Sequence, residues 1–143
     1  MRERVDKIVG FGSESVWVST FHSTCVRILR RYIDRLGYDT RFAIYDTEDQ
    51  KTLMKEVCRK LNIDTKKTKE RSLLEQFSHA KDELITPDEM ELNAGGDLVK
   101  KKVAEVYREY QVALRRNNAL DFDDLIVKTI HFTASYIIPL QLH

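Results

Sequence analysis

Apolar side chains recur along most of this chain at intervals of three or four residues, the spacing that places them on one face of an α-helix. Ser23, for example, can cap a helix that runs to about Leu36, in which Val26, Leu29 and Ile33 share one face. The same period predicts further helices over residues 47–62, 73–84, 87–93, 97–117 and 121–130. The pattern therefore predicts a bundle of about five or six helices.

Residues near the expected helix ends agree with this pattern. Thr86 and Glu89 form a capping box around Pro87, and Thr47 with Gln50 forms another. Only 5 glycines and 2 prolines occur in 143 residues, which is too few for the many turns of a β-sandwich or barrel. We therefore expect a mainly α fold, organised as a multi-helix bundle.

Two segments depart from the helical pattern. Val16–Thr20, V-W-V-S-T, is a short β-type run, and Arg41–Tyr45 is the nearest candidate for a partner strand. Further along, residues 132–142 contain no charged side chain. We therefore expect a short N-terminal β-strand remnant, whose own sheet is missing from the chain, and an atypical tail over residues 132–143.

The charge balance limits the possible partners. With 24 basic and 23 acidic side chains the net charge is +1, whereas a free-standing nucleic-acid domain usually carries a clear basic excess. Any basic surface must therefore be local. No apolar run approaches the roughly 20 residues that span a bilayer, and the first residues lack the apolar stretch of a signal peptide. These features predict a cytoplasmic protein that does not engage a membrane.

Candidate metal ligands are few. Cys25 and Cys58 lie far apart in apolar helical segments, without the spacing of a zinc site, so we expect both to be buried and reduced. Asp121, Asp123 and Asp124 fall within four residues and could bind Mg²⁺. A helix N-terminus, however, favours carboxylates for capping alone. We therefore favour a helix cap at Asp121 and assign no metal site.

The most distinctive candidate site is the sequence T-F-H-S, which leads into a helix with four arginines. The hydroxyls of Thr20 and Ser23, with free N–H groups at the start of that helix, suit a phosphate. Phe21 or His22 could stack on a nucleobase, and Arg27 could contact the backbone of a polyanion. The alternative is a corner histidine bonded to the backbone, beside a solvated arginine face.

No motif for nucleotide hydrolysis is present in the sequence. It has no G-x-x-x-x-G-K-[ST] phosphate loop, and Gly95-Gly96 lacks the lysine and the hydroxyl residue that such a loop requires. It also has no H-E-x-x-H or G-x-S-x-G motif. We therefore assign no catalytic residue and no cofactor-binding residue within the chain.

Three segments are distinctive in combination. They are M-R-E-R-V at the start, V-W-V-S-T-F-H-S-T-C-V-R-I-L-R-R after it, and N-A-L-D-F-D-D-L-I further on. They resemble the end of motif Ia, the block around T-F-H-S and the block before motif II of UvrD/PcrA/Rep-type superfamily 1 DNA helicases, most of all the PcrA branch. The resemblance runs from residue 1 to about His131. It implies a remnant of the RecA-like motor domain over residues 1–22, the inserted helical subdomain 1B over residues 23–131, and the atypical tail over residues 132–143.

The resemblance implies that the parent protein is an ATP-dependent 3′-to-5′ DNA helicase or translocase in DNA repair or replication, with ATP and Mg²⁺ as its cofactors. In that family the T-F-H-S block lines the track of the single-stranded DNA. Thr20, Phe21, His22 and Ser23 would therefore contact DNA in this chain. Arg27, on the basic helix that follows, is the fifth expected contact.

Other parts of the family pattern are missing from the sequence. It lacks the Walker A loop, the acidic D-E-x-Q block and the second motor domain, and only the end of motif Ia, with Arg2 and Arg4, is present. We therefore expect an inactive fragment that binds single-stranded DNA weakly and whose partners are the motor domains of the parent helicase. Two alternatives remain: a free-standing helical interaction or adaptor module, and a Mg²⁺-dependent nuclease built on Asp121, Asp123 and Asp124.

Overall fold

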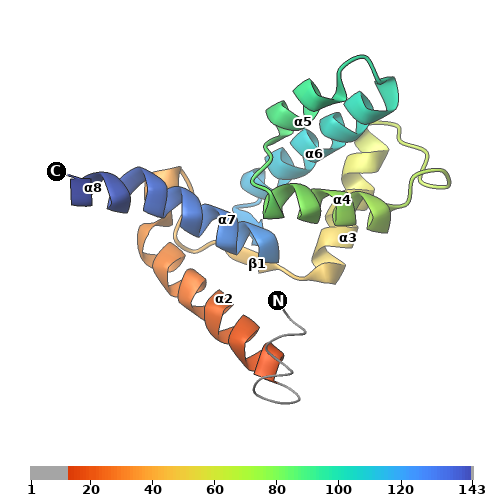
Figure 1. The fold of residues 1–143 in the computed structure, drawn as a ribbon. Helices are drawn as coiled ribbons and strands as arrows, with labels where there is room; N and C mark the ends of the chain where they lie inside the picture. The colour runs from red at the N-terminus through yellow and green to blue at the C-terminus, as the bar shows by residue number, and fades with distance from the viewer. Residues whose placement is uncertain (1–12, 143) are drawn as a thin grey trace.

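The computed structural model describes residues 13–142, which form a mainly helical structure (Figure 1). The α-helices are α2 (Ser13–Tyr32), α3 (Thr47–Lys60), α4 (Glu70–Asp82), α5 (Pro87–Ala94), α6 (Leu98–Arg116), α7 (Phe122–Phe132) and α8 (Ile138–Leu142). A 3₁₀-helix, η1 (Ile33–Leu36), continues α2, and a π-helix, η2 (Thr133–Ile137), joins α7 to α8. None of the described helices is long and apolar enough to cross a membrane. The prediction of a mainly α, multi-helix fold is confirmed.

Two three-residue strands, β1 and β2, pair in parallel near the centre of the molecule. Strand β1 covers Ala43–Tyr45, inside the segment named as the nearest candidate partner for Val16–Thr20. Its actual partner, β2, covers Ala119–Asp121, which the sequence pattern did not reveal. The register pairs Ala43 with Ala119, Ile44 with Leu120 and Tyr45 with Asp121. Helices α3 to α6 therefore form the segment of the chain between the two paired strands.

The strand expected at Val16–Thr20 is wrong, because these residues lie inside α2. Their β propensity is a weak preference that depends on neighbouring strands, and β1 pairs with β2 instead. A lone strand would leave its backbone N–H and C=O groups unpaired, whereas a helix pairs them internally. Downstream, Cys25, Leu29 and Ile33 are buried at intervals of four residues and anchor the helix. Ser23 is consequently an interior residue of α2 and not its N-cap.

The buried side chains form two clusters. The first lies among α3, α4 and α6 and includes Phe77, which stacks on Tyr107 with 4.8 Å between ring centroids. The second lies among α2, η1 and α7. Figure 1 shows the corresponding division, with α3 to α6 on one side of β1 and α2, α7 and α8 on the other. Cys58 belongs to the first cluster and Cys25 to the second, and both are buried and unbonded, as predicted.

Capping boxes begin α5 and α3. The box predicted for α5 is confirmed, since the Thr86 hydroxyl accepts a hydrogen bond from the Glu89 N–H at 3.1 Å. For α3 the predicted N-cap, Thr47, is wrong by one residue. Asp46 caps this helix, and its carboxylate accepts from the Asp49 N–H at 2.9 Å. The preceding aspartate prevails because a carboxylate is a better N-cap than a threonine hydroxyl.

The uncharged segment after α7 is helical and packs against α2. Its backbone runs from α7 through η2 into α8. The Tyr32 ring of α2 stacks on Phe132 at 5.0 Å, and Phe132 stacks on Tyr136 at 5.5 Å. The Tyr136 hydroxyl also donates a hydrogen bond to the Arg35 carbonyl oxygen at 2.9 Å. Aromatic contacts therefore tie this segment to the C-terminal end of α2.

Candidate nucleic-acid interface

Four of the five residues expected to contact DNA are exposed on α2. Thr20, Phe21, Ser23 and Arg27 are exposed, and His22 is half-buried. Positions 20, 23 and 27 are spaced by three and four residues, so their side chains share one face of the helix. The structure therefore places two hydroxyls and a guanidinium on one face of about two turns of α2, and the phenyl ring of Phe21 projects beside that face.

Three aromatic rings meet beside this part of α2. The ring centroids of Phe21 and His22 are 6.5 Å apart, and those of His22 and Phe122 are 6.1 Å apart, both in edge-to-face arrangements. Phe122 is the first residue of α7. Phe21 is 55% exposed and Phe122 is 44% exposed. We call Phe21, His22 and Phe122 the aromatic cluster, in which the imidazole connects two solvent-facing rings.

Phe122 is the residue of this cluster that the sequence did not identify. It stands in the carboxylate-rich segment D-F-D-D, 100 positions after His22, and only the folded chain brings the two rings together. One signal was available. Asp121 was expected to cap the helix, which makes Phe122 the first residue of its first turn. Asp121 is buried, whereas the Phe122 ring beside it in the sequence is partly exposed.

The expected contribution from free N–H groups is wrong. Residues 20–23 lie well inside α2, which begins at Ser13, so their N–H groups belong to the hydrogen-bonding ladder of the helix. The Thr24 hydroxyl also donates to the Thr20 carbonyl oxygen at 3.0 Å. Only side chains of this face are therefore available to a phosphate. Arg2 and Arg4, in the motif Ia segment, lie outside the described residues.

The arginines of α2 have different surroundings. The Arg30 guanidinium donates to the carbonyl oxygens of Thr40, at 3.1 Å, and Phe42, and it lies 3.9 Å from the centroid of the Phe42 ring. Arg30 therefore anchors the loop that leads into β1. Arg27 is exposed and takes part in none of the ion pairs found among residues 13–142. Arg27 is the better placed of the two to meet an external phosphate.

A buried network of charged groups lies behind Phe122. The Lys81 ammonium of α4 is 2.6 Å from Asp121 Oδ2 and 3.0 Å from Asp124 Oδ1. The Tyr110 hydroxyl of α6 donates to Asp121 Oδ2 at 3.0 Å. The other carboxylate oxygen of Asp121 accepts from the Asp124 N–H at 2.8 Å, which confirms the predicted cap. All four side chains are buried, so the first turn of α7 is held from the interior.

Burial and charge shift the pKa values of this network in opposite directions. Burial alone would lower the pKa of Lys81, but the charges of Asp124 and Asp121 outweigh it and raise the pKa above its ordinary value. Burial raises the pKa of Asp124, and the Lys81 charge opposes that rise. Burial also raises the pKa of Tyr107 to about 12. Lys81 therefore remains a cation at neutral pH and compensates the buried carboxylates.

The geometry favours the helix-cap interpretation of D-F-D-D over the nuclease alternative. Asp121 and Asp124 are engaged by Lys81 and by backbone N–H groups. Burial raises the pKa of the third carboxyl group, Asp123, which disfavours its charged form. In the part of the chain that the structure describes, no three His, Cys, Asp or Glu side chains are grouped to hold a metal ion.

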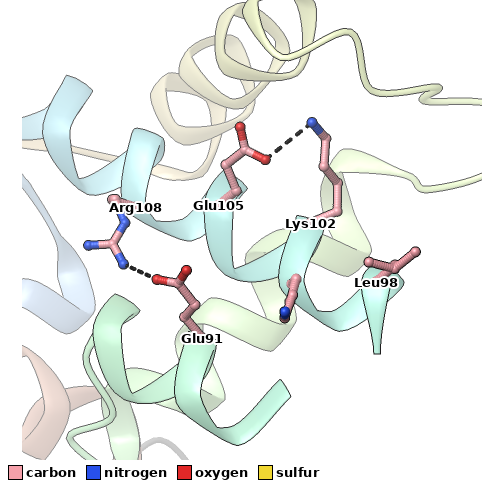
Figure 2. A pocket seen from close by; sticks show the side chains of 6 residues that line it. Glu91, Leu98, Lys102, Glu105 and Arg108 are labelled. Atoms are coloured by element: carbon pink, nitrogen blue, oxygen red, sulfur yellow. Dashed lines mark hydrogen bonds and ion pairs between the residues drawn. The ribbon is translucent and has the colours of Figure 1, made fainter. Parts of the chain in front are cut away.

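A separate hollow of about 290 Å³ lies over α5 and α6 (Figure 2). Figure 2 shows the Arg108 guanidinium directed at Glu91 and the Lys102 ammonium directed at Glu105. These ion pairs measure 2.8 Å and 3.2 Å. Because four of its charged groups already pair with one another, we assign this hollow no ligand.

The structure is a helical domain that carries the exposed aromatic cluster, and comparison with known proteins gives its class. A sequence profile of the UvrD/REP helicase N-terminal domain matches residues 1–139. The chain therefore belongs to this family of PcrA- and UvrD-type helicases, as the three sequence blocks predicted. The profile match ends at residue 139, a little beyond His131, near which the resemblance was expected to end.

Curated proteins similar to this chain include helicases named PcrA. The chain is 49% identical over 130 residues to the ATP-dependent DNA helicase PcrA of Bacillus subtilis (strain 168). It is 50% identical over 131 residues to PcrA of Staphylococcus aureus (strain Mu50 / ATCC 700699), and 47% identical over 131 residues to that of Staphylococcus epidermidis. These matches cover 91% to 92% of the chain and 18% of each relative. The chain therefore spans less than a fifth of the length of the relatives it matches.

Proposed function

We propose that this chain is the helical subdomain 1B, with an adjoining edge of the RecA-like motor domain, of an ATP-dependent 3′-to-5′ DNA helicase or translocase in DNA repair or replication. The proposed division is the motor-domain remnant over residues 1–22, subdomain 1B over 23–131 and the tail over 132–143. Family membership and the identities of 49% and 50% to PcrA support this assignment. The proposed location is the cytoplasm, and the proposed partners are single-stranded DNA and the motor domains of the parent.

The observation that carries the proposal within this chain is the aromatic cluster. Single-stranded DNA is commonly bound by aromatic side chains on which bases stack, beside basic groups that follow the backbone. Phe21 and Phe122 offer two exposed rings for bases. Arg27 and the two hydroxyls on the same helix would meet the phosphates. In this arrangement His22 keeps the two rings together through its edge-to-face contacts.

We expect weak binding that depends on salt, because the net charge is +1 and few phosphates can be neutralised. Each neutralised phosphate of a single strand contributes about −0.7 to the slope of log affinity against log salt. The Arg27→Ala variant is therefore expected to flatten this slope by about 0.7 and to weaken binding to different sequences alike. The measurement is fluorescence anisotropy of dye-labelled oligo-dT and oligo-dA over a series of salt concentrations.

The matched control for this measurement is Arg59→Ala. Arg59 is an exposed arginine in the last turn of α3, so its removal changes the net charge by the same amount away from the candidate interface. We expect Arg59→Ala to leave the salt slope unchanged. Equal effects of the two variants would contradict the assignment of the α2 face.

In this proposal ATP and Mg²⁺ act in the motor domains of the parent helicase. Phosphoryl transfer needs a phosphate cradle, a metal-holding acid and charge-stabilising arginines, and this sequence has no phosphate-loop motif. The 143-residue chain is therefore expected to show no hydrolysis of radiolabelled ATP above a blank without protein, with or without single-stranded DNA. Turnover that follows the protein through purification would overturn this expectation.

One observation favours a second candidate function, a helical protein-interaction or adaptor module. Leu92, Leu98 and Val99, around the turn between α5 and α6, are among the most exposed large apolar side chains of the described residues. Such an apolar surface is typical of a protein-binding site. Oligo-dT binding measured at low salt distinguishes the two functions, because an adaptor module would bind no oligo-dT.

A further inference from the structure

Helices α3 to α6 meet the start of α7 at one buried cation, the ammonium group of Lys81. The side chain of Lys81 is 3% exposed, and those of Asp121 and Asp124 are 4% and 2% exposed. Lys81 comes from α4 and Tyr110 from α6, on the side of the first cluster, whereas both carboxylates belong to the start of α7. Of the described residues, Lys81 is the one that forms an ion pair with these carboxylates.

The same turn of helix carries the buried network on its inner side and an aromatic ring on its outer side. Asp121 is the N-cap of α7, Phe122 is its first residue, and Asp124 closes the capping box. The Asp121 N–H donates to Asp124 Oδ2 at 3.2 Å, so the box is closed in both directions. The position of the Phe122 ring against His22 therefore follows from how this turn is held.

Without the Lys81 ammonium, the first turn of α7 would contain two buried carboxylates with no cation between them. Both contact the same nitrogen atom, so they lie close enough to repel each other strongly in a dry environment. Removing one partner of a buried ionic group leaves an uncompensated charge, which the structure relieves by moving or by hydrating the site. Here such a movement would displace the first turn of α7, which carries Phe122.

We propose that Lys81 is a positioning residue for the single-stranded DNA surface: it contacts no DNA itself, but it fixes the first turn of α7 so that the Phe122 ring stays against His22. This inference rests on the proposed function, because it concerns how that surface is assembled. It assigns a role in DNA binding to a side chain that is buried on the inner side of α7 and belongs to another helix.

The first test compares Lys81→Met with Leu73→Ala, a core deletion on the same helix that leaves the α7 turn untouched. Both variants are expected to lose stability. With folding verified by circular dichroism, Lys81→Met is expected to raise the Kd for oligo-dT about tenfold, the equivalent of losing one stacked ring. The Kd of Leu73→Ala is expected to stay within about twofold of that of the unsubstituted chain. Equal Kd values for Lys81→Met and the unsubstituted chain would overturn the proposal.

A double-mutant cycle with Phe122→Ala tests whether Lys81 acts through this ring. If it does, Lys81→Met adds no weakening beyond about twofold in the Phe122→Ala background. A full additional tenfold loss would overturn the positioning role. Should Lys81→Met fail to fold, Asp124→Asn takes its place, since it keeps an oxygen for the cap while weakening the ionic contact. It is expected to raise Kd about threefold, again only when Phe122 is present.

A measurement without DNA separates this inference from the proposed function. The Phe122 ring lies edge-to-face with His22, so ring currents shift the NMR signals of the His22 imidazole protons. In Lys81→Met these signals are expected to move toward their positions in Phe122→Ala, whereas Leu73→Ala leaves them in place. Absence of oligo-dT binding by the unsubstituted chain would contradict the proposed function. Unchanged His22 signals in Lys81→Met would contradict the positioning role.

Discussion

Replacing Phe77 by alanine is expected to lower the free energy of unfolding by about 3–5 kcal/mol. Phe77 is 1% exposed and stacks on Tyr107, with the Tyr110 ring 6.1 Å away. Its deletion removes buried apolar surface and aromatic contacts and leaves a cavity between α4 and α6, and these costs add. A loss of that size is a large fraction of the roughly 5–15 kcal/mol that stabilises an ordinary domain. Urea unfolding followed by far-ultraviolet circular dichroism measures it.

The matched control is Phe122→Ala, which deletes the same ring at a position that is 44% exposed. Its expected cost is below about 1 kcal/mol, because no closed cavity forms. The two variants therefore separate the core from the candidate interface. If Phe77→Ala proved as harmless as Phe122→Ala, the first cluster would not be the packed core described above.

Removing both exposed rings, in the double variant Phe21→Ala/Phe122→Ala, is expected to weaken oligo-dT binding by about 30-fold or more. Each base stacked on an aromatic ring contributes about 1–3 kcal/mol by alanine substitution, and about 1.4 kcal/mol corresponds to a factor of ten in affinity. Anisotropy of a labelled oligonucleotide gives the Kd. The single tryptophan, Trp17, lies one helical turn before Phe21 and is exposed, so its emission provides a second signal.

The control for this double variant is Leu92→Ala/Leu98→Ala, which removes two exposed apolar side chains around the α5–α6 turn. This pair is expected to leave the Kd unchanged, because neither residue belongs to the aromatic cluster or packs against it. Similar losses in both double variants would indicate nonspecific apolar binding. A double variant of Phe21 and Phe122 that binds as tightly as the parent would remove the basis for the proposed interface.

The sequence predicts those parts of the fold that depend on neighbours three or four positions apart. The apolar stripe with Leu29 and Ile33, the capping box of Thr86 and the cap at Asp121 are all local patterns, and the structure contains each of them. The run Val16–Thr20 fails as a strand prediction because its outcome depends on whether a second strand is present to pair with it. That information is not local.

The candidate interface was predictable on α2 but not on α7. T-F-H-S places an aromatic ring, an imidazole and hydroxyls in consecutive positions, which any reading of the sequence can identify. Phe122 joins them because the second cluster packs α7 against α2 and so brings the start of α7 beside the middle of α2. Lys81 and Asp121 are 40 positions apart. No periodicity in the sequence indicates that these two residues meet.

The parallel pairing of β1 and β2 has a consequence for how much the length of this chain can vary. The Ala43 N–H donates to the Asn118 carbonyl oxygen at 2.9 Å, so the segment between them begins and ends at hydrogen-bonded neighbours. A segment whose ends meet in this way can gain or lose residues in its exposed turns without moving its attachment points. The turn at Gly95-Gly96 between α5 and α6 is such a place, whereas Lys81 and Tyr110 are fixed by their contacts with α7. We therefore expect insertions and deletions to be tolerated at the turn between α5 and α6. We expect them to be excluded near Lys81 and Tyr110, which contact the start of α7.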